Sequence, residues 1–243
     1  MSWEPFSLHF KQVFDGGYKY LDNCGRLMLL AEEHLCLMPE DVKPSGCKMT
    51  LPESGIAVVL DSSELAITQE LHKDNGAEFI NVCQVMEQLV REVFEPRHVE
   101  SNGFASKMYW ALGSSDAVLA ASLKFGKGLP ADVARDVEMP ARQESVDCHF
   151  AAGSFDLHLQ IHPVTFQSLT FQKFNPPPLA TAAHRRRLDR LNQKAERMNT
   201  TLRQGIMMDI DLIEFDPPMA PLAKHFEQLK KKELILQGRF NVL

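Results

Sequence analysis

The stretch from residue 188 to residue 216 constrains the fold most, because its hydrophobic period changes from that of a helix to that of a strand. In its first part, apolar residues recur at spacings of three and four, on one stripe of an α-helix: Leu188, Leu191, Ala195, Met198 and Leu202. In its second part, apolar residues occupy every second position, as on the buried face of a strand: Ile206, Met208, Ile210 and Leu212. This stretch therefore predicts a long helix that is followed directly by a strand.

The two parts of this stretch carry opposite charge. Residues 184–203 hold seven basic and two acidic side chains, whereas residues 206–216 hold four acidic side chains and no basic one. We expect the helix and the strand to lie together, with arginines facing the carboxylates. In one alternative, Asp209 and Asp211 bind a divalent cation. In the other, an outward basic stripe contacts the phosphates of a nucleic acid: Arg186, Arg190, Lys194 and Arg197.

The composition is that of an ordinary globular chain. Its 243 residues are 44% hydrophobic and 24% charged, enough for one large or two small domains with a sizeable core. The net charge of −6 argues against nucleic-acid binding over the whole surface. No apolar run approaches the roughly 20 residues that span a bilayer, and the start lacks the features of a signal peptide. Five widely spaced cysteines without a CxxC pair suit reduced thiols, so we expect a cytoplasmic protein without membrane contact.

Turn and period signals divide the first half of the chain into strands and helices. Asn75 and Glu78 have the spacing of a capping box, which predicts the start of a long helix. The full set of expected elements is a strand at 8–14, a helix from about Asp22 to Leu37, a hairpin at 56–71, a helix from Asn75 to Pro96, a strand at 98–112 and a short helix from Ser115.

The clearest hairpin of the chain opens the second half. Apolar and polar residues alternate through 146–150 and again through 155–162. If Gly153 and Ser154 form a two-residue turn, His149 lies opposite His158 and both strands agree on which side is the core. A further strand at 166–174, the basic helix, the acidic strand and a helix from about Ala220 follow.

The order of these elements predicts two similar halves. Residues 55–124 and 145–240 each begin with antiparallel strands and continue with a long helix, a strand and a helix. The segment between them has scattered charge, glycines and prolines but no apolar period. We therefore expect an α+β protein with mostly antiparallel sheets, divided into an N-terminal half at 1–128 and a C-terminal half at 129–243.

The end of the chain resembles a known family. The paired acids in Met208-Asp209-Ile210-Asp211, the later helix with Leu222, His225-Phe226 and Leu229, and the late Phe240 carry the likeness. These residues resemble the end of a sporadically distributed bacterial family of uncharacterised proteins of about this length. The resemblance implies a bacterial accessory gene, and it supplies no activity or catalytic residue.

The hairpin offers a second place for metal chemistry. His149 and His158 would lie about 5 Å apart at Cβ, with Asp147 and Asp156 diagonal to them on the same face. Such a quartet has the ligand types of a transition-metal site. His162 lies four residues further along the strand, about 13 Å from His158, and is too distant to share an ion. A solvated polar sheet face accounts for all of these residues without a metal, so we expect no tightly bound ion.

The catalytic motifs that the sequence lacks narrow the function. There is no glycine-rich phosphate loop, no Gly-x-Ser-x-Gly, no His-Glu-x-x-His and no cysteine beside a recognisable histidine base. We therefore expect a non-catalytic binding or scaffold protein of a bacterial accessory system, without cofactor or catalytic residues. Its expected partner is another protein, or a nucleic acid through the basic helix. The alternative is a metal-dependent hydrolase or nuclease that uses a carboxylate and histidine cluster.

Overall fold

Strands dominate the architecture of this protein. The structure is a computed structural model that describes residues 3–17, 19–70, 76–125, 145–167, 185, 186, 188, 189, 202–217 and 222–240. The elements in chain order are β1 (Glu4–Phe14), α1 (Lys19–Leu35), β2 (Met38–Lys43), β3 (Gly46–Leu51), β4 (Ile56–Asp61), β5 (Glu64–Glu70), α2 (Ala77–Phe94), β6 (Val99–Leu112), α3 (Ser115–Phe125), β7 (Val146–Ala152), β8 (Phe155–Gln167), β9 (Leu202–Phe215) and α6 (Leu222–Phe240).

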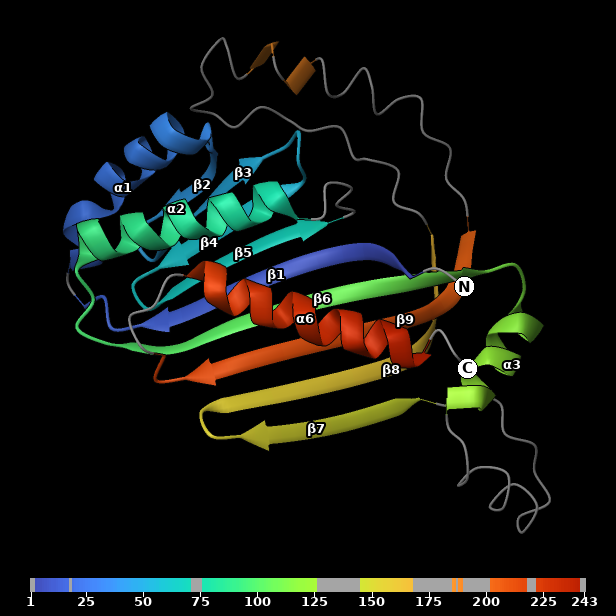
Figure 1. Cartoon of the computed structure of the whole chain (residues 1–243). Helices are drawn as coiled ribbons and strands as arrows, with labels where there is room; N and C mark the ends of the chain where they lie inside the picture. The colour runs from blue at the N-terminus through green and yellow to red at the C-terminus, as the bar shows by residue number, and fades with distance from the viewer. Residues whose placement is uncertain are drawn as a thin grey trace.

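All nine described strands form one open antiparallel sheet. Their order is β2-β3-β4-β5-β1-β6-β9-β8-β7, so β2 and β7 are its outer strands. Helices α1, α2 and α6 cover one face of the sheet, and α3 lies at one end (Figure 1). The expected α+β class with antiparallel strands is thus confirmed. None of the helices in the described part of the chain is long and apolar enough to span a bilayer.

Alternating apolar residues form the core between the sheet and its helices. On β9 the predicted inward set is buried: Ile206, Met208, Ile210 and Leu212. The same holds for the predicted stripe of α2 and for Leu222, Phe226 and Leu229 of α6. Phe226 joins three elements, because its ring lies 6.0 Å from that of Phe79 on α2 and 5.7 Å, edge-on, from that of Phe104 on β6. These aromatic contacts fasten α6 to the sheet.

The hairpin prediction at the start of the second half is confirmed in its register. His149 pairs with His158 and Phe150 with Leu157 across the Gly153-Ser154 turn. Gly153 has a φ of 62°, a left-handed conformation that glycine adopts at little cost in a two-residue turn. The expected helices at α3 and α6 and the strand at β6 are confirmed as well.

Several boundaries differ from the expectations. The hairpin of β2 and β3 was not predicted, because Pro39 and the charged residues of β2 hide its strand pattern. Helix α2 begins at Ala77, and its N-cap residue is the left-handed Gly76 rather than the expected Asn75. Asn75 itself lies outside the described residues, so the capping box with Glu78 stays a prediction. Glu78 accepts a hydrogen bond from the Ser54 hydroxyl.

The region around the basic helix also needs correction. Leu202 and Arg203 belong to β9, where they pair with Gln167 and Phe166, rather than to the end of a helix. Phe166 and Gln167 continue β8 rather than start a new strand; the rest of the expected strand, 168–174, lies outside the described residues.

The proposed likeness of the two halves is not shown by this topology. In the first half β1 lies between β5 and β6, whereas in the second half β8 and β9 are direct neighbours. Strands from both sides of the expected boundary between residues 128 and 129 join in one sheet, through the pairing of β6 with β9. The boundary itself lies outside the described residues and stays a prediction.

Candidate functional site

Two rows of polar residues cross the sheet on the face opposite to α1, α2 and α6. They arise because every second residue of each strand points away from the helices. One row, from β5 to β7, consists of five polar residues and one alanine: Thr68, His9, Ala105, Asp211, His158 and His149. The neighbouring row consists of Glu70, Ser7, Lys107, Asp209, Gln160 and Asp147. We call these twelve residues the polar rows.

The polar rows bring together the two groups of site residues that the sequence suggests separately. Asp211 of the acidic strand pairs with His158 of the hairpin. Sequence reasoning missed the contribution of His9, Ser7 and Lys107, because it did not predict that β6 lies beside β9 and that β1 lies beside β6. Their positions alternate with apolar residues, but that pattern alone does not say which strands are neighbours.

At the β7 end of the rows, Asp147, His149 and His158 form a compact cluster. His158 Nε2 donates a hydrogen bond to Asp147 Oδ1 at 2.6 Å, and His149 Nε2 lies 3.8 Å from the same oxygen. The two imidazole rings stack with centroids 4.0 Å apart. Gln160 Nε2 donates to Asp147 Oδ2 at 3.2 Å. These hydrogen bonds, from His158 first, lower the pKa of Asp147 below its ordinary value and keep it ionised.

In the middle of the rows the carboxylates are less exposed. Lys107 Nζ lies 3.6 Å from Asp209 Oδ2, so a lysine of β6 faces this acidic strand. Burial raises the pKa of Asp211, and the neighbouring His158 and His9 offset part of that shift. His9 shares a 2.9 Å hydrogen bond with the Ser7 hydroxyl, and burial together with Lys107 lowers its pKa. A carboxyl with a raised pKa between two histidines is the kind of group that can exchange protons.

The exposure of the cluster formed by Asp147, His149 and His158 limits the chemistry that it can perform. The side chains of His149, Asp147 and His158 are 75%, 56% and 30% exposed. Catalytic sites are usually concave, because excluded water strengthens the electrostatic interactions inside them. The cluster on β7 and β8 therefore has the side chains of a metal or binding site without the enclosure of an active site.

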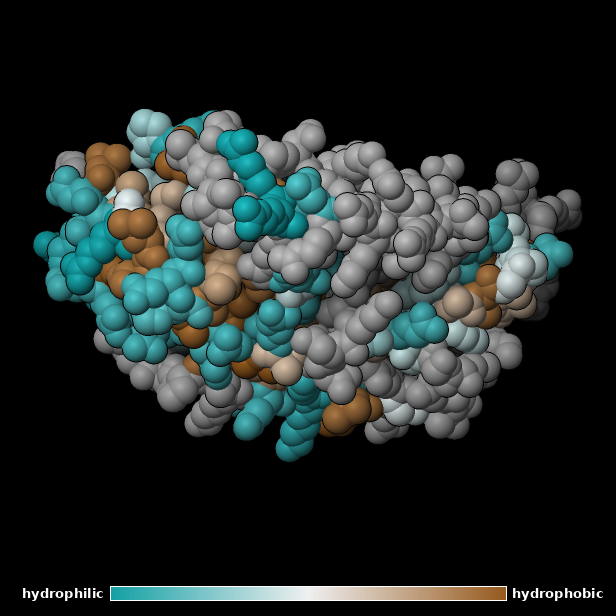
Figure 2. Space-filling view, turned by 90° about the horizontal axis from the view of Figure 1, so that it is seen from above, coloured by the Kyte–Doolittle hydropathy of each residue, from teal (hydrophilic) through white to brown (hydrophobic). Residues whose placement is uncertain are grey.

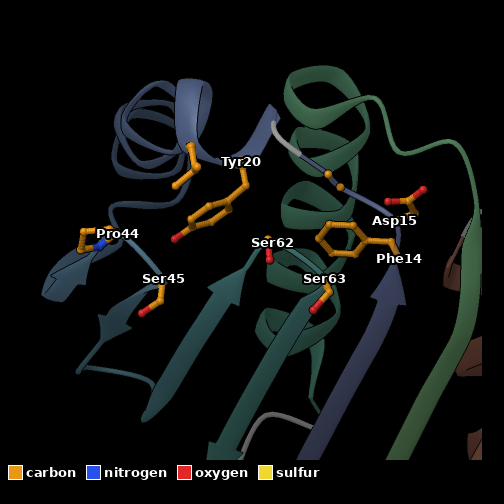
Figure 3. A pocket seen from close by; sticks show the side chains of 10 residues that line it. Phe14, Asp15, Tyr20, Pro44, Ser45, Ser62 and Ser63 are labelled. Carbon is orange, nitrogen blue, oxygen red and sulfur yellow. The ribbon is translucent and has the colours of Figure 1, made fainter.

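A pocket lies at one end of the sheet, far from the cluster in sequence. It has a volume of about 430 Å³ and lies between the β1–α1 loop, the β2–β3 turn and the β4–β5 turn. Tyr20, Ser45 and Ser62 lie around it (Figure 3). The Tyr20 hydroxyl is buried without a hydrogen-bond partner among the described residues, and burial raises its pKa. Asp15 is the charged side chain that lines this pocket. The lining residues make the pocket polar, but they do not place a nucleophile beside a general base.

The outer side of α1 is a further exposed surface. Leu21 and Leu29 are 61% and 69% exposed. Seen from above, apolar side chains lie between hydrophilic ones at the end of the molecule that carries α1 (Figure 2). Single exposed leucines of this kind are normal on soluble domains.

Most of the predicted basic stripe falls outside the described residues. Arg186 is described, in a helical segment, and is exposed. Arg190, Lys194 and Arg197 are not described, so both the outward basic stripe and the expected pairing of arginines with the carboxylates of β9 stay predictions. Comparison with known proteins adds no assignment: no family model and no curated protein matches this chain.

Proposed function

We propose that this chain is a non-catalytic binding protein that takes up an extended segment of a partner protein along β7. Addition of a strand to an open sheet edge is a common way to recognise proteins, since backbone hydrogen bonds supply affinity and side-chain contacts supply specificity. The observation that carries the proposal is that β7 is an outer strand of the described sheet and that its own residues lack the features that usually protect such an edge.

The hydrogen-bond phase of β8 identifies which groups of β7 face outward. The backbone N–H of Phe215, on β9, donates to the carbonyl oxygen of Ser154 at 2.9 Å, so these two residues form a hydrogen-bonded pair. Such pairs recur at every second residue, and the even-numbered residues of β8 therefore direct their backbone N–H and C=O groups to β9. Odd-numbered residues of β8 then bond to β7, through its even-numbered residues. The backbone N–H and C=O groups of Asp147, His149 and Ala151 therefore point away from β8, along the edge.

The other outer strand, β2, has features that protect its edge against pairing with a further strand. It contains a proline and several charged residues, and its register shifts between Pro39 and Asp41. Such features prevent edge-to-edge pairing. β7 has neither proline nor lysine and no register shift, and its Phe150 is 54% exposed. This contrast supports β7 as the side that receives a partner strand.

Catalysis is the weaker alternative. A metal-dependent hydrolase or nuclease would use the same carboxylates and histidines of the polar rows. The exposure of His149 and Asp147 argues against it, because water would compete with substrate at every step. An activity screen with divalent metals, in which Asp209→Asn abolishes turnover, would favour the enzyme.

The experiment on β7 removes one outward N–H without touching the bonds to β8. Ala151→Pro does this, and Val42→Pro is the matched change on β2. Partners captured by the wild-type chain should be lost with Ala151→Pro and kept with Val42→Pro, while both variants stay folded by circular dichroism. Hydrogen exchange of the complex should show protection at the amides of Asp147 and His149. Retention of the partner by Ala151→Pro would refute the proposal.

Contact with nucleic acid through the basic segment is a second proposal, supported by the exposed Arg186. If Arg186, Arg190, Lys194 and Arg197 each neutralise one phosphate, log affinity for duplex DNA should fall with log salt at a slope of about −3.6, since each contact contributes roughly 0.9. A salt-independent or absent binding signal would exclude it. Membership of the bacterial family suggested by the C-terminal residues also stays a proposal.

A further inference from the structure

We propose that Asp147, His149 and His158 bind one divalent transition-metal ion, of which Zn²⁺ is the best fit, at the β7–β8 hairpin. This inference does not depend on partner binding along β7. It revises the expectation that a solvated polar face is sufficient, because the structure places Asp147 next to both histidines and adds supporting groups behind the ligands.

The three donor atoms are already spaced almost as a metal requires. Their ligand atoms lie within 4.8 Å of one another. With metal–ligand bonds of about 2.0–2.1 Å, the ligand atoms of a tetrahedral site are about 3.4 Å apart. The present separations from Asp147 Oδ1 are 2.6 Å to His158 and 3.8 Å to His149. Shifts of less than about 1 Å, within the reach of side-chain rotation, thus convert the hydrogen-bonded cluster into a metal site.

The backbone fixes this arrangement. Asp147 and His149 are two residues apart on β7, so both side chains leave the same face of the strand. His149 and His158 do not exchange backbone hydrogen bonds, as the phase of the sheet shows, and pairs of this type are the closer ones, about 4.5 Å apart at Cα. The two-residue turn at Gly153 holds the two strands in this register.

Two further residues support the ligands from behind. Gln160 donates to Asp147 Oδ2, so Oδ1 is the oxygen that would bind an ion in place of its hydrogen bond with His158. Asp211 lies opposite His158 on β9, on the side away from β7. A carboxylate behind a histidine and a donor on a ligating carboxylate are the groups that orient metal ligands in proteins. The two carboxylates also balance the charge of a divalent cation.

The donor set selects the class of metal. Two imidazoles and one carboxylate suit Zn²⁺ and other late first-row ions, whereas Mg²⁺ and Ca²⁺ prefer oxygen ligands alone. Since His149 is 75% exposed, water reaches the cluster and completes the coordination. The site is therefore of the open, three-ligand type.

The test uses the full chain stripped with a chelator and then titrated with Zn²⁺ by calorimetry. One equivalent should bind, and Mg²⁺ should not compete. His158→Ala and Asp147→Asn should abolish this binding. His162→Ala is the matched control, since His162 shares the face of β8 but lies outside the cluster, and it should bind as the wild type does. Asp211→Asn should weaken binding about 10-fold, as expected for a supporting carboxylate.

Two other readouts separate this site from adventitious binding by thiols. Co²⁺ should give the intense visible absorption of a four- or five-coordinate nitrogen and oxygen site, without a thiolate charge-transfer band. Zn²⁺ at 100 times its dissociation constant should raise the stability of the wild type and leave His158→Ala unchanged. The inference is wrong if the wild type binds no stoichiometric Zn²⁺, or if His158→Ala and His162→Ala bind it equally well.

Discussion

Gly205 of β9 lies directly against the ring of Tyr109 on β6. A Cβ atom at Gly205 would lie 2.5 Å from Tyr109 Cε2 and 2.8 Å from Cζ, and it would also overlap the carbonyl oxygen of Trp110. The Tyr109 hydroxyl donates to the carbonyl oxygen of Gln204 at 2.8 Å, so the ring is held in place over the glycine. Strands β6 and β9 come this close together here because Gly205 has no side chain.

Gly205→Ala should therefore destabilise the protein by about 1–3 kcal/mol, since the backbone of Trp110 cannot move aside without disturbing β6. Urea unfolding followed by circular dichroism measures this. Gly25→Ala is the control: the added Cβ meets nothing within 4 Å and sits in α1, so it should stabilise by about 1 kcal/mol. Equal stability of the Gly205→Ala variant and the wild type would contradict the packing described here.

Phe226→Ala should cost about 3–5 kcal/mol, because it empties the space between α6, α2 and β6. The residue is 3% exposed, and two other aromatic rings pack against it. Leu234→Ala, on the exposed side of the same helix, should change the unfolding free energy by less than about 0.5 kcal/mol. If both variants lose the same stability, α6 is not fastened through Phe226.

Asp61→Ala should cost about 1–2 kcal/mol by opening the β4–β5 turn. Asp61 Oδ1 accepts hydrogen bonds from the backbone N–H groups of Ser63 and Glu64, both at 2.8 Å. Asp61→Asn retains an oxygen acceptor and should lose less than half as much. Thermal unfolding of the two variants in parallel tests the order; an equal loss for the asparagine and alanine variants would show that the charge of Asp61, not its role as an acceptor, matters.

Asp211→Asn should increase the free energy of unfolding at neutral pH. Burial raises the folded pKa of Asp211 above its ordinary value of 3.8, so the folded state holds this proton more tightly than the unfolded chain does. The contribution of this group thus favours folding below pH 3.8 and becomes unfavourable as the pH rises through the folded pKa. The asparagine cannot ionise, so this decline with rising pH should flatten.

Unfolding titrations between pH 3 and pH 8 measure the effect of Asp211→Asn. Asp156→Asn is the control, because Asp156, on β8, is exposed and lies on the same face of the sheet as Asp211. A variant less stable than the wild type at neutral pH would mean that the attraction of Asp211 to His158, His9 and Lys107 outweighs the cost of its burial.

The local parts of this fold could be predicted from the sequence. Alternation and the Gly153-Ser154 turn give the register of β7 and β8, because a two-residue hairpin leaves no other pairing that buries the apolar side. Helical spacing gives the inward faces of α2 and α6. In each case neighbouring residues determine the result.

The non-local parts could not be predicted in the same way. Leu202 and Arg203 continue a helical spacing in sequence, yet they form strand because β8 lies beside them. The polar rows depend on β1 standing between β5 and β6, which no local pattern encodes. The pairing of β8 with β9 is also non-local, so the sequence predicts the two candidate groups, at His158 and at Asp211, as separate sites.

The central place of β1 has a consequence for the order of folding. Strands β2 to β5 pair with their neighbours in the chain and can form as soon as they are synthesised. β1 is made first, but its partner on one side is β6, and Phe10 meets Phe104 only after the chain has closed a long loop. During synthesis one side of β1 therefore stays unpaired until β6 is made, and one side of β6 stays unpaired until β9 is made. Folding should be slow for a chain of this size, with a delayed final step in which the strands from both ends of the chain join.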